Sequence, residues 1–132
     1  VSIFAVEKNE ARADAIKAEF PTTVGCPVFV IKGDFLAIKD MPPMYDFALL
    51  NPPFEEGQDI DHVQHAYELL KPGGVLVSVM GEGALFFRGD KKATNFREWL
   101  ERAGGESFPL PDGSFKESGT GVKARLVKIV HG

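Results

Sequence analysis

Short apolar runs that alternate with helical segments constrain the fold of this chain more than any other feature. Four such runs have the length of strands buried in a sheet, and they cover residues 1–6, 28–31, 45–50 and 75–80. Helical periodicity lies between several of them. Strands that alternate with helices predict an α/β fold with a mostly parallel sheet.

The remaining segments complete this order of elements. Helices are expected over residues 10–20, 61–70 and 96–103, and two antiparallel strands over residues 108–115 and 122–130. Asn9 is a candidate N-cap of the first helix, and Thr94 or Asn95 of the last. The last two strands flank a Gly-rich turn, so the sheet is expected to close with a C-terminal antiparallel hairpin.

The composition is that of a soluble globular domain. Of the 132 residues, 44% are hydrophobic and 26% are charged, which suits one domain with one core. No apolar run is long enough to span a membrane. The single cysteine, Cys26, excludes a disulfide within the chain, and no Cys and His cluster predicts a metal site. A reducing, cytoplasmic setting fits these features.

Charge is distributed unevenly along the chain. The net charge of −4 argues against nucleic-acid binding by bulk charge. Residues 1–85 carry 6 basic and 13 acidic side chains, whereas residues 86–132 carry 9 basic and 6 acidic ones. The C-terminal part therefore either faces an anion or has an ordinary solvated surface.

The sequence Asn51-Pro52-Pro53-Phe54 directly follows the run at 45–50. Each proline fixes its own φ angle and keeps the preceding residue away from helical angles. The resulting stiff turn can aim the Asn51 amide oxygen and the Pro52 carbonyl in one direction. Two such acceptors suit a flat amino group with two N–H donors, and Phe54 offers a face on which an aromatic ring can stack.

A strand followed by Asn-Pro-Pro-Phe resembles the catalytic motif of class I S-adenosylmethionine-dependent amino-methyltransferases, with the N6-adenine DNA methyltransferases as the best match. The resemblance implies a Rossmann-like sheet and a catalytic role for Asn51, Pro52, Pro53 and Phe54. Asn51 and Pro52 would accept hydrogen bonds from the target amine, and Phe54 would stack on a base flipped out of DNA.

The same resemblance implies positions for the cofactor S-adenosylmethionine. Glu7, at the end of the first strand, would bind the ribose hydroxyls. Asp34 would accept from the adenine amine of the cofactor, with Phe35 against its ring, and Asn51 would complete the cofactor site. Ligands of open α/β sheets bind beyond the carboxyl ends of strands, where these residues stand.

Two further segments are candidates for substrate contacts. Residues 115–122 resemble the closing hairpin that lines the target-base pocket of adenine methyltransferases, so Phe115 and Lys116 are expected there, although a plain hairpin turn explains them equally well. Residues 86–92 combine aromatic and basic side chains and either contact phosphates or form a solvated loop.

The first strand of the family fold, with its Gly-rich loop, is missing from the sequence given. In that fold it lies between the strands that match residues 1–6 and 45–50, so its absence leaves two unpaired edges and exposed apolar faces. We therefore expect residues 1–132 to be a partial catalytic domain, with weak or no cofactor binding. The alternatives are a smaller sheet, or a homodimer whose second copy fills the gap.

Other substrates and a non-enzymatic role stay open at this point. The same loop can hold the exocyclic amine of guanine in ribosomal RNA or the side-chain amide of a protein glutamine. Phe at position 54 and the closing segment favour adenine in DNA. A methyltransferase-like module that only binds a partner would also explain the missing Gly-rich loop.

Overall fold

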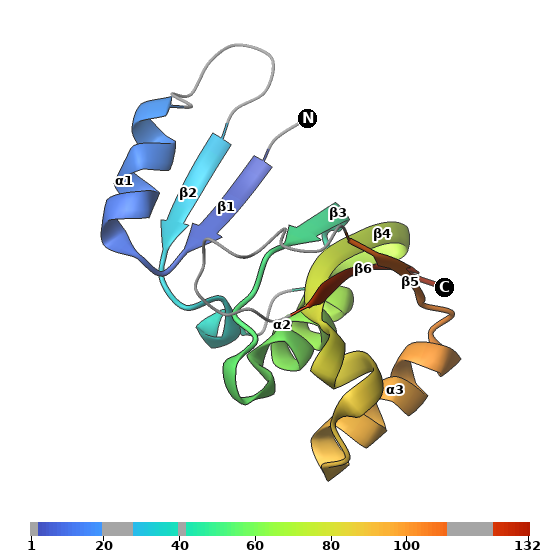
Figure 1. The fold of residues 1–132 in the computed structure, drawn as a ribbon. Coiled ribbons are helices and arrows are strands. Elements are labelled where there is room, and N and C mark those ends of the chain that lie inside the picture. The colour runs from blue at the N-terminus through green and yellow to red at the C-terminus, as the bar shows by residue number, and fades with distance from the viewer. Residues whose placement is uncertain (1–2, 20–27, 40–41, 111–122) are drawn as a thin grey trace. The chain divides into compact units, whose positions relative to one another are not determined.

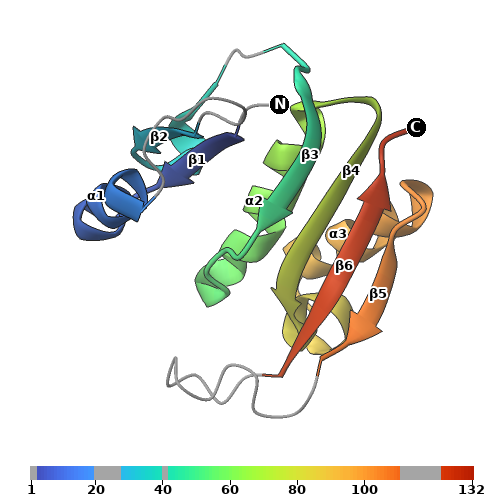
Figure 2. The same cartoon turned by 90° about the horizontal axis from the view of Figure 1, so that it is seen from above.

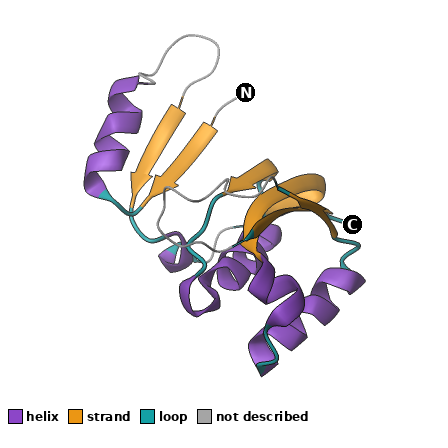
Figure 3. Ribbon diagram, viewed as in Figure 1, coloured by secondary structure: helices purple, strands orange, loops and turns teal. Residues whose placement is uncertain are grey.

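The computed structural model describes residues 3–19, 28–39, 42–110 and 123–132. The chain divides into two compact units, Val1–Asp40 and Met41–Gly132. Figure 1 shows the order of helices and strands, and Figure 3 shows how they alternate along the chain.

The N-terminal unit is a β-α-β unit. Strand β1 (Ile3–Glu7) runs parallel to β2 (Val28–Lys32), and helix α1 (Glu10–Glu19) connects them on one face of the pair. A short 3-10 turn, η1 (Phe35–Ala37), follows β2. The predicted cap is confirmed, because the Asn9 side chain accepts a hydrogen bond of 2.9 Å from the Arg12 N–H.

The C-terminal unit contains a mixed sheet in the order β3-β4-β6-β5. Its strands are β3 (Tyr45–Leu50), β4 (Leu70–Gly81), β5 (Glu106–Pro109) and β6 (Ala124–Val130). β3 is parallel to β4, whereas β6 is antiparallel to both β4 and β5. The predicted α/β fold and the closing antiparallel strand pair are therefore confirmed.

Two helices cover one face of this sheet. Figure 2 shows α2 (Gln58–Glu68) and α3 (Lys91–Arg102) on the same side of the strands. The core lies between these layers and contains fully buried side chains from both, among them Val63 of α2, Phe96 of α3, Leu76 of β4 and Ile129 of β6. This packing positions the loops that follow β3 and β4.

The opposite face of the sheet carries exposed apolar side chains. Phe47 and Leu49 of β3 are 71% and 82% exposed. Within the described residues, β3 pairs only with β4 and β1 pairs only with β2. The predictions that the runs at 1–6, 28–31 and 45–50 are buried strands are therefore wrong, because burial also requires a neighbouring strand and a covered face. The expectation of exposed apolar faces agrees with the structure.

Several element boundaries differ from the sequence-based expectation. α2 covers residues 58–68 instead of 61–70, and β5 covers residues 106–109 instead of 108–115, of which 111–115 lie outside the described residues. β4 begins at Leu70 instead of residue 75, because Gly73 and Gly74 form backbone hydrogen bonds of 2.8 Å with His131 and so extend the strand region. α3 begins at Lys91 instead of residue 96, because Asp90 caps it by accepting from the Ala93 N–H. The His131 partner is distant in sequence and has no local signal, whereas Asp90 is a local cap that the choice of Thr94 or Asn95 overlooked.

Candidate functional site

In the loop after β3, one proline is buried and the residues on either side of it are exposed. Pro52 is buried, whereas Asn51 and Pro53 are exposed and Phe54 is half-buried. Within the described residues, the Asn51 amide makes no hydrogen bond. A buried proline fixes the backbone at this point, so the neighbouring Asn51 amide is presented to solvent on a rigid support.

Phe54 packs against the carboxyl end of β4 at Gly81. A Cβ atom at position 81 would lie 3.4 Å from two ring carbons of Phe54. The absence of a side chain at Gly81 therefore lets the ring lie directly against the backbone of the strand. This contact joins the loop that follows β3 to the end of the neighbouring strand.

Asp59, in the first turn of α2, strengthens the same connection. Its side chain is 1% exposed, and one carboxylate oxygen accepts a hydrogen bond of 3.1 Å from the Gly81 N–H. The other oxygen accepts from the Ile60 N–H at 3.0 Å. The buried carboxylate thus ties the start of α2 to the end of β4. In the sequence, Glu55, Glu56, Asp59 and Asp61 form an acidic run before a predicted helix, and nothing local points to the contact between Asp59 and Gly81.

Burial raises the pKa of the Asp59 carboxyl above its usual range, although its backbone hydrogen bonds act in the opposite direction. The folded protein therefore holds this proton more tightly than the unfolded chain. As the pH rises from the usual pKa of 3.8 towards the raised value, the unfolded state releases its proton first. The contribution of this group to stability is full at lower pH and falls across that window.

We expect the substitution Asp59→Asn to remove this pH dependence. The free energy of unfolding of the wild type, minus that of the variant, should decrease as the pH rises from about 3.8 and then level off. Urea denaturation at a series of pH values measures the difference. Parallel curves for the two proteins would contradict the assignment of a raised pKa to Asp59.

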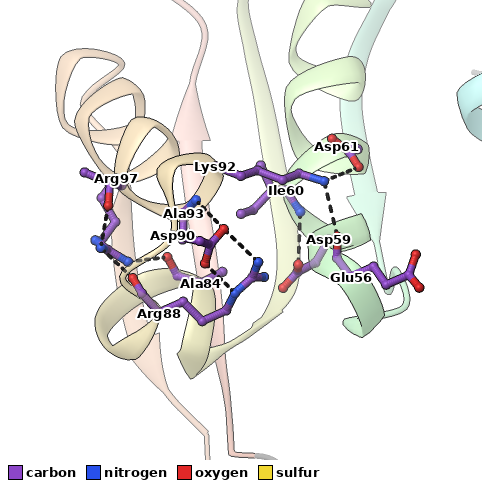
Figure 4. Close-up of polar contacts among 11 residues, drawn as sticks. Glu56, Asp59, Ile60, Asp61, Ala84, Arg88, Asp90, Lys92, Ala93 and Arg97 are labelled. Carbon is purple, nitrogen blue, oxygen red and sulfur yellow. Dashed lines mark hydrogen bonds and ion pairs between the residues drawn. The ribbon is translucent and has the colours of Figure 1, made fainter.

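Lys92 of α3 ties down the turn that precedes α2. Its ammonium group donates to the Asp61 carboxylate at 2.7 Å and to the Glu56 carbonyl at 3.3 Å (Figure 4). Glu56 has a φ angle of 55°, a left-handed conformation that is uncommon for a residue other than glycine. Asp59 is buried and Asp61 is paired, so half of the acidic run is already engaged within the protein.

A second polar network fixes the loop after β4, which contains the π-helical turn η3 (Gly83–Phe87). Arg97 of α3 donates to the carbonyls of Ala84 and Arg88 at 3.2 and 2.8 Å. Arg88 in turn binds both carboxylate oxygens of Asp90 at 2.9 Å (Figure 4). The loops after β3 and β4 are therefore both anchored to α3.

The predicted cofactor residues of the N-terminal unit lie at one end of its strand pair. Glu7 ends β1 opposite Lys32, and the Gly33 N–H donates to the Glu7 carbonyl at 3.0 Å. The Glu7 carboxylate accepts from the Asn9 N–H at 3.1 Å. The Asp34 carboxylate, directly after Gly33, accepts from the Leu36 N–H at 3.0 Å.

Both carboxylates therefore cap their own loops. Phe35, the expected ring partner, is half-buried beside the exposed Asp34. The structure thus brings Glu7, Asp34 and Phe35 to one end of the β1–β2 pair, and it places Asn51, Pro52, Pro53 and Phe54 at the end of β3 in the other unit.

Some sequence-based candidates lie outside the described residues, namely Phe115, Lys116 and Cys26. Within the ranges that are described, no group of three or more His, Cys, Asp or Glu side chains is arranged to hold a metal ion. No helix in those ranges has the length and apolarity needed to cross a membrane.

Comparison with solved structures identifies the type of fold. The M protein of the type I restriction enzyme EcoKI superimposes on 98% of this chain with a TM-score of 0.70 and 20% sequence identity. The chain has a methyltransferase fold. The N-methyltransferase NodS from Bradyrhizobium japonicum, solved with S-adenosyl-L-homocysteine, matches 97% of it with a TM-score of 0.64 and 12% identity.

A third similar structure is, by its name, an enzyme that transfers methyl groups to oxygen. The O-methyltransferase from Bacillus cereus, solved with S-adenosyl-L-homocysteine, covers 98% of the chain with a TM-score of 0.59 and 18% identity. The chain spans 31% of the EcoKI M protein, 65% of NodS and 62% of this enzyme. No protein-family model and no curated protein sequence matches the chain. The predicted α/β, Rossmann-like methyltransferase architecture is confirmed at the level of the fold.

Proposed function

We propose that this chain carries the catalytic residues of an S-adenosylmethionine-dependent N-methyltransferase that acts on an exocyclic amine, most specifically N6 of adenine in DNA. One observation carries the proposal: the exposed Asn51 amide follows the end of β3 on a backbone fixed by buried Pro52, next to an aromatic ring fixed on Gly81. This arrangement provides an exposed amide acceptor at Asn51 and, at Phe54, a ring that can serve as a stacking surface. The structural likeness to the EcoKI M protein supports a nucleic-acid substrate.

For methyl transfer, the protein mainly has to orient the target amine relative to the methyl group. Bound S-adenosylmethionine supplies an electrophilic methyl group on a sulfonium sulfur. The Asn51 side-chain oxygen and the Pro52 carbonyl accept the two N–H groups of the target amine. These bonds draw the nitrogen lone pair out of conjugation with the ring and align it with the methyl carbon. Transfer of the methyl group would leave S-adenosylmethionine as a neutral thioether and release one proton from the amine to solvent, while Asn51 and Pro52 would hold the amine nitrogen in place.

The carboxylates of the N-terminal unit fit the polar groups of the cofactor. Glu7 and Asp34 each use carboxylate oxygen to bind a backbone N–H of their own loop, and this contact holds the side chain at the strand end. Carboxylate oxygens have several lone pairs, so each group can still accept from a ribose hydroxyl or from the adenine amine. Solved structures with this fold contain S-adenosyl-L-homocysteine, which supports the assignment.

Asp34→Ala should weaken cofactor binding while leaving the fold intact. Loss of a hydrogen bond to a charged acceptor corresponds to about a 10- to 100-fold lower affinity. Titration calorimetry of S-adenosylmethionine into wild type and variant measures the change. Asp14→Ala, which removes an exposed carboxylate of α1 in the same unit, is the matched control and should leave the affinity unchanged. Equal affinity for wild type and Asp34→Ala would contradict the role of Asp34.

Methyl transfer itself is the direct test. The protein as its native gene encodes it is incubated with S-adenosylmethionine labelled in the methyl group and with DNA, ribosomal RNA or a glutamine peptide. Recovery of labelled N6-methyladenine after nuclease digestion of the DNA is the expected result. If the label is found on guanine N2, on glutamine or on a hydroxyl group, that group is the acceptor and the assignment to adenine is wrong. Cofactor binding without transfer to any of these acceptors would favour a non-catalytic binding module.

A further inference from the structure

Phe86, in the turn η3, presents an aromatic ring to solvent above a fixed positive charge. The side chain is 53% exposed. The guanidinium carbon of Arg125 lies 5.1 Å from the centroid of the ring. This is the geometry of a cation–π pair, in which the cation covers part of the ring and makes its electron density less negative.

Both partners of this pair are held in place by other contacts. Arg125 donates to the side-chain oxygen of Ser107 at 3.2 Å and to its carbonyl at 3.4 Å. The turn that carries Phe86 is fixed by Arg97, which donates to the Ala84 carbonyl at 3.2 Å. The ring is therefore pre-organised, and binding on it would restrict little additional motion of the protein.

The pair lies at the same end of the sheet as the candidate amine site. Arg125 is opposite Met80 in the pairing of β6 with β4, one residue before Gly81, which contacts Phe54. Phe54 follows β3 and Arg125 belongs to β6, so the two features flank the end of β4 on either side. Strands β3 and β6 are about 10 Å apart, so the chain brings the two rings to the end of β4 from its two sides.

We propose that Phe86, backed by Arg125, is a second stacking site, which binds a nucleobase adjacent to the target base in single-stranded or locally opened nucleic acid. The proposal rests on the proposed function, because it assumes a nucleic-acid substrate at Phe54. Base stacking on an aromatic ring tolerates any sequence, so this site would position the strand instead of selecting a base.

Basic residues on the elements next to η3 and Arg125 suit a polyanionic strand. Lys123, two residues before Arg125, is exposed, and Lys91 at the start of α3 is exposed as well. The Asp90 carboxylate, which follows η3 in the chain, is paired with Arg88 through two hydrogen bonds. A strand stacked on Phe86 would therefore find cationic side chains for its phosphates, and binding should weaken as the salt concentration rises.

Fluorescence anisotropy of a labelled single-stranded DNA oligonucleotide tests the site without requiring catalysis. Phe86→Leu should raise the dissociation constant by about 5-fold to 100-fold, the range expected for the loss of one stacked base. Phe86→Trp should restore the affinity, because it keeps an aromatic face. Phe47→Leu is the matched control, since Phe47 is a more exposed phenylalanine on β3, and its affinity should equal that of the wild type.

Two further readouts distinguish this site from the proposed function. A 2-aminopurine base placed next to the target adenine should lose fluorescence on binding to the wild type and less on binding to Phe86→Leu. Calorimetric affinity for S-adenosylmethionine should be the same in both proteins. Unchanged oligonucleotide affinity in Phe86→Leu, or a wild type that does not bind the oligonucleotide, overturns the stacking site. Failure of methyl transfer with a persistent Phe86 effect on binding overturns the catalytic proposal instead.

Discussion

Asn51→Ala should lower the rate of methyl transfer by at least 10²- to 10³-fold while leaving the affinity for S-adenosylmethionine within about twofold. The Asn51 amide is exposed at the end of β3, and alanine removes the acceptor without disturbing the buried neighbour Pro52. The lost interaction is strongest when the amine nitrogen becomes positively charged in the transition state. The loss should therefore fall mainly on kcat and less on KM.

Two companion variants make this result specific. Asn51→Asp keeps an oxygen acceptor of the same length and should retain measurable transfer. Asn95→Ala removes an exposed asparagine from α3 and should behave as the wild type. Single-turnover assays measure the rates, and calorimetry measures cofactor affinity. A parallel loss of cofactor binding and transfer in Asn51→Ala would count against an acceptor role for Asn51.

Phe96→Ala should destabilise the C-terminal unit by about 3–5 kcal/mol, the usual cost of a large cavity in a core. Phe96 is completely buried between α3 and the sheet, and its ring stacks on Trp99 with centroids 5.7 Å apart. The helix also carries Lys92 and Arg97, which anchor the loops after β3 and β4. Loss of packing at Phe96 should therefore loosen the candidate site as well as lower stability.

Urea denaturation followed by fluorescence of Trp99, the single tryptophan, measures this change. Phe108→Ala is the matched control, because Phe108 of β5 is exposed on the uncovered side of the sheet and should cost less than about 1 kcal/mol. Equal destabilisation by the two substitutions would show that Phe96 is not the centre of this core.

The order of helices and strands was predictable from the sequence, because each element has a local sequence signal. Strand β3 has the predicted bounds of 45–50, and Asn9 caps α1 as its position before an Ala-rich segment predicts. Phe96, an apolar residue within the segment predicted to be the last helix, belongs to the core. Hydrogen bonds within a helix and the identity of its cap depend on residues only a few positions apart, so local sequence is sufficient.

The candidate site is predictable only in part, for the same reason. The Asn51–Phe54 loop is recognisable because a whole motif stands directly after a strand. Whether residues 1–132 form one catalytic domain, and whether Glu7 and Asp34 hold a cofactor, stays a prediction. The exposure of Phe47 was not predictable from its run, because an apolar strand becomes buried only where another element covers it.

The sequence by itself determined the α/β architecture, the motif after β3 and the residue types available for an amine acceptor. The tertiary structure alone decided which distant groups meet. Pairing of β4 with β6 sets Arg125 opposite Met80, beneath the ring of Phe86, and close packing at Gly81 brings Phe54 and Asp59 to one strand end. These contacts join residues 22 or more positions apart, where no local rule of spacing operates and only the packing of strands and helices selects the partner.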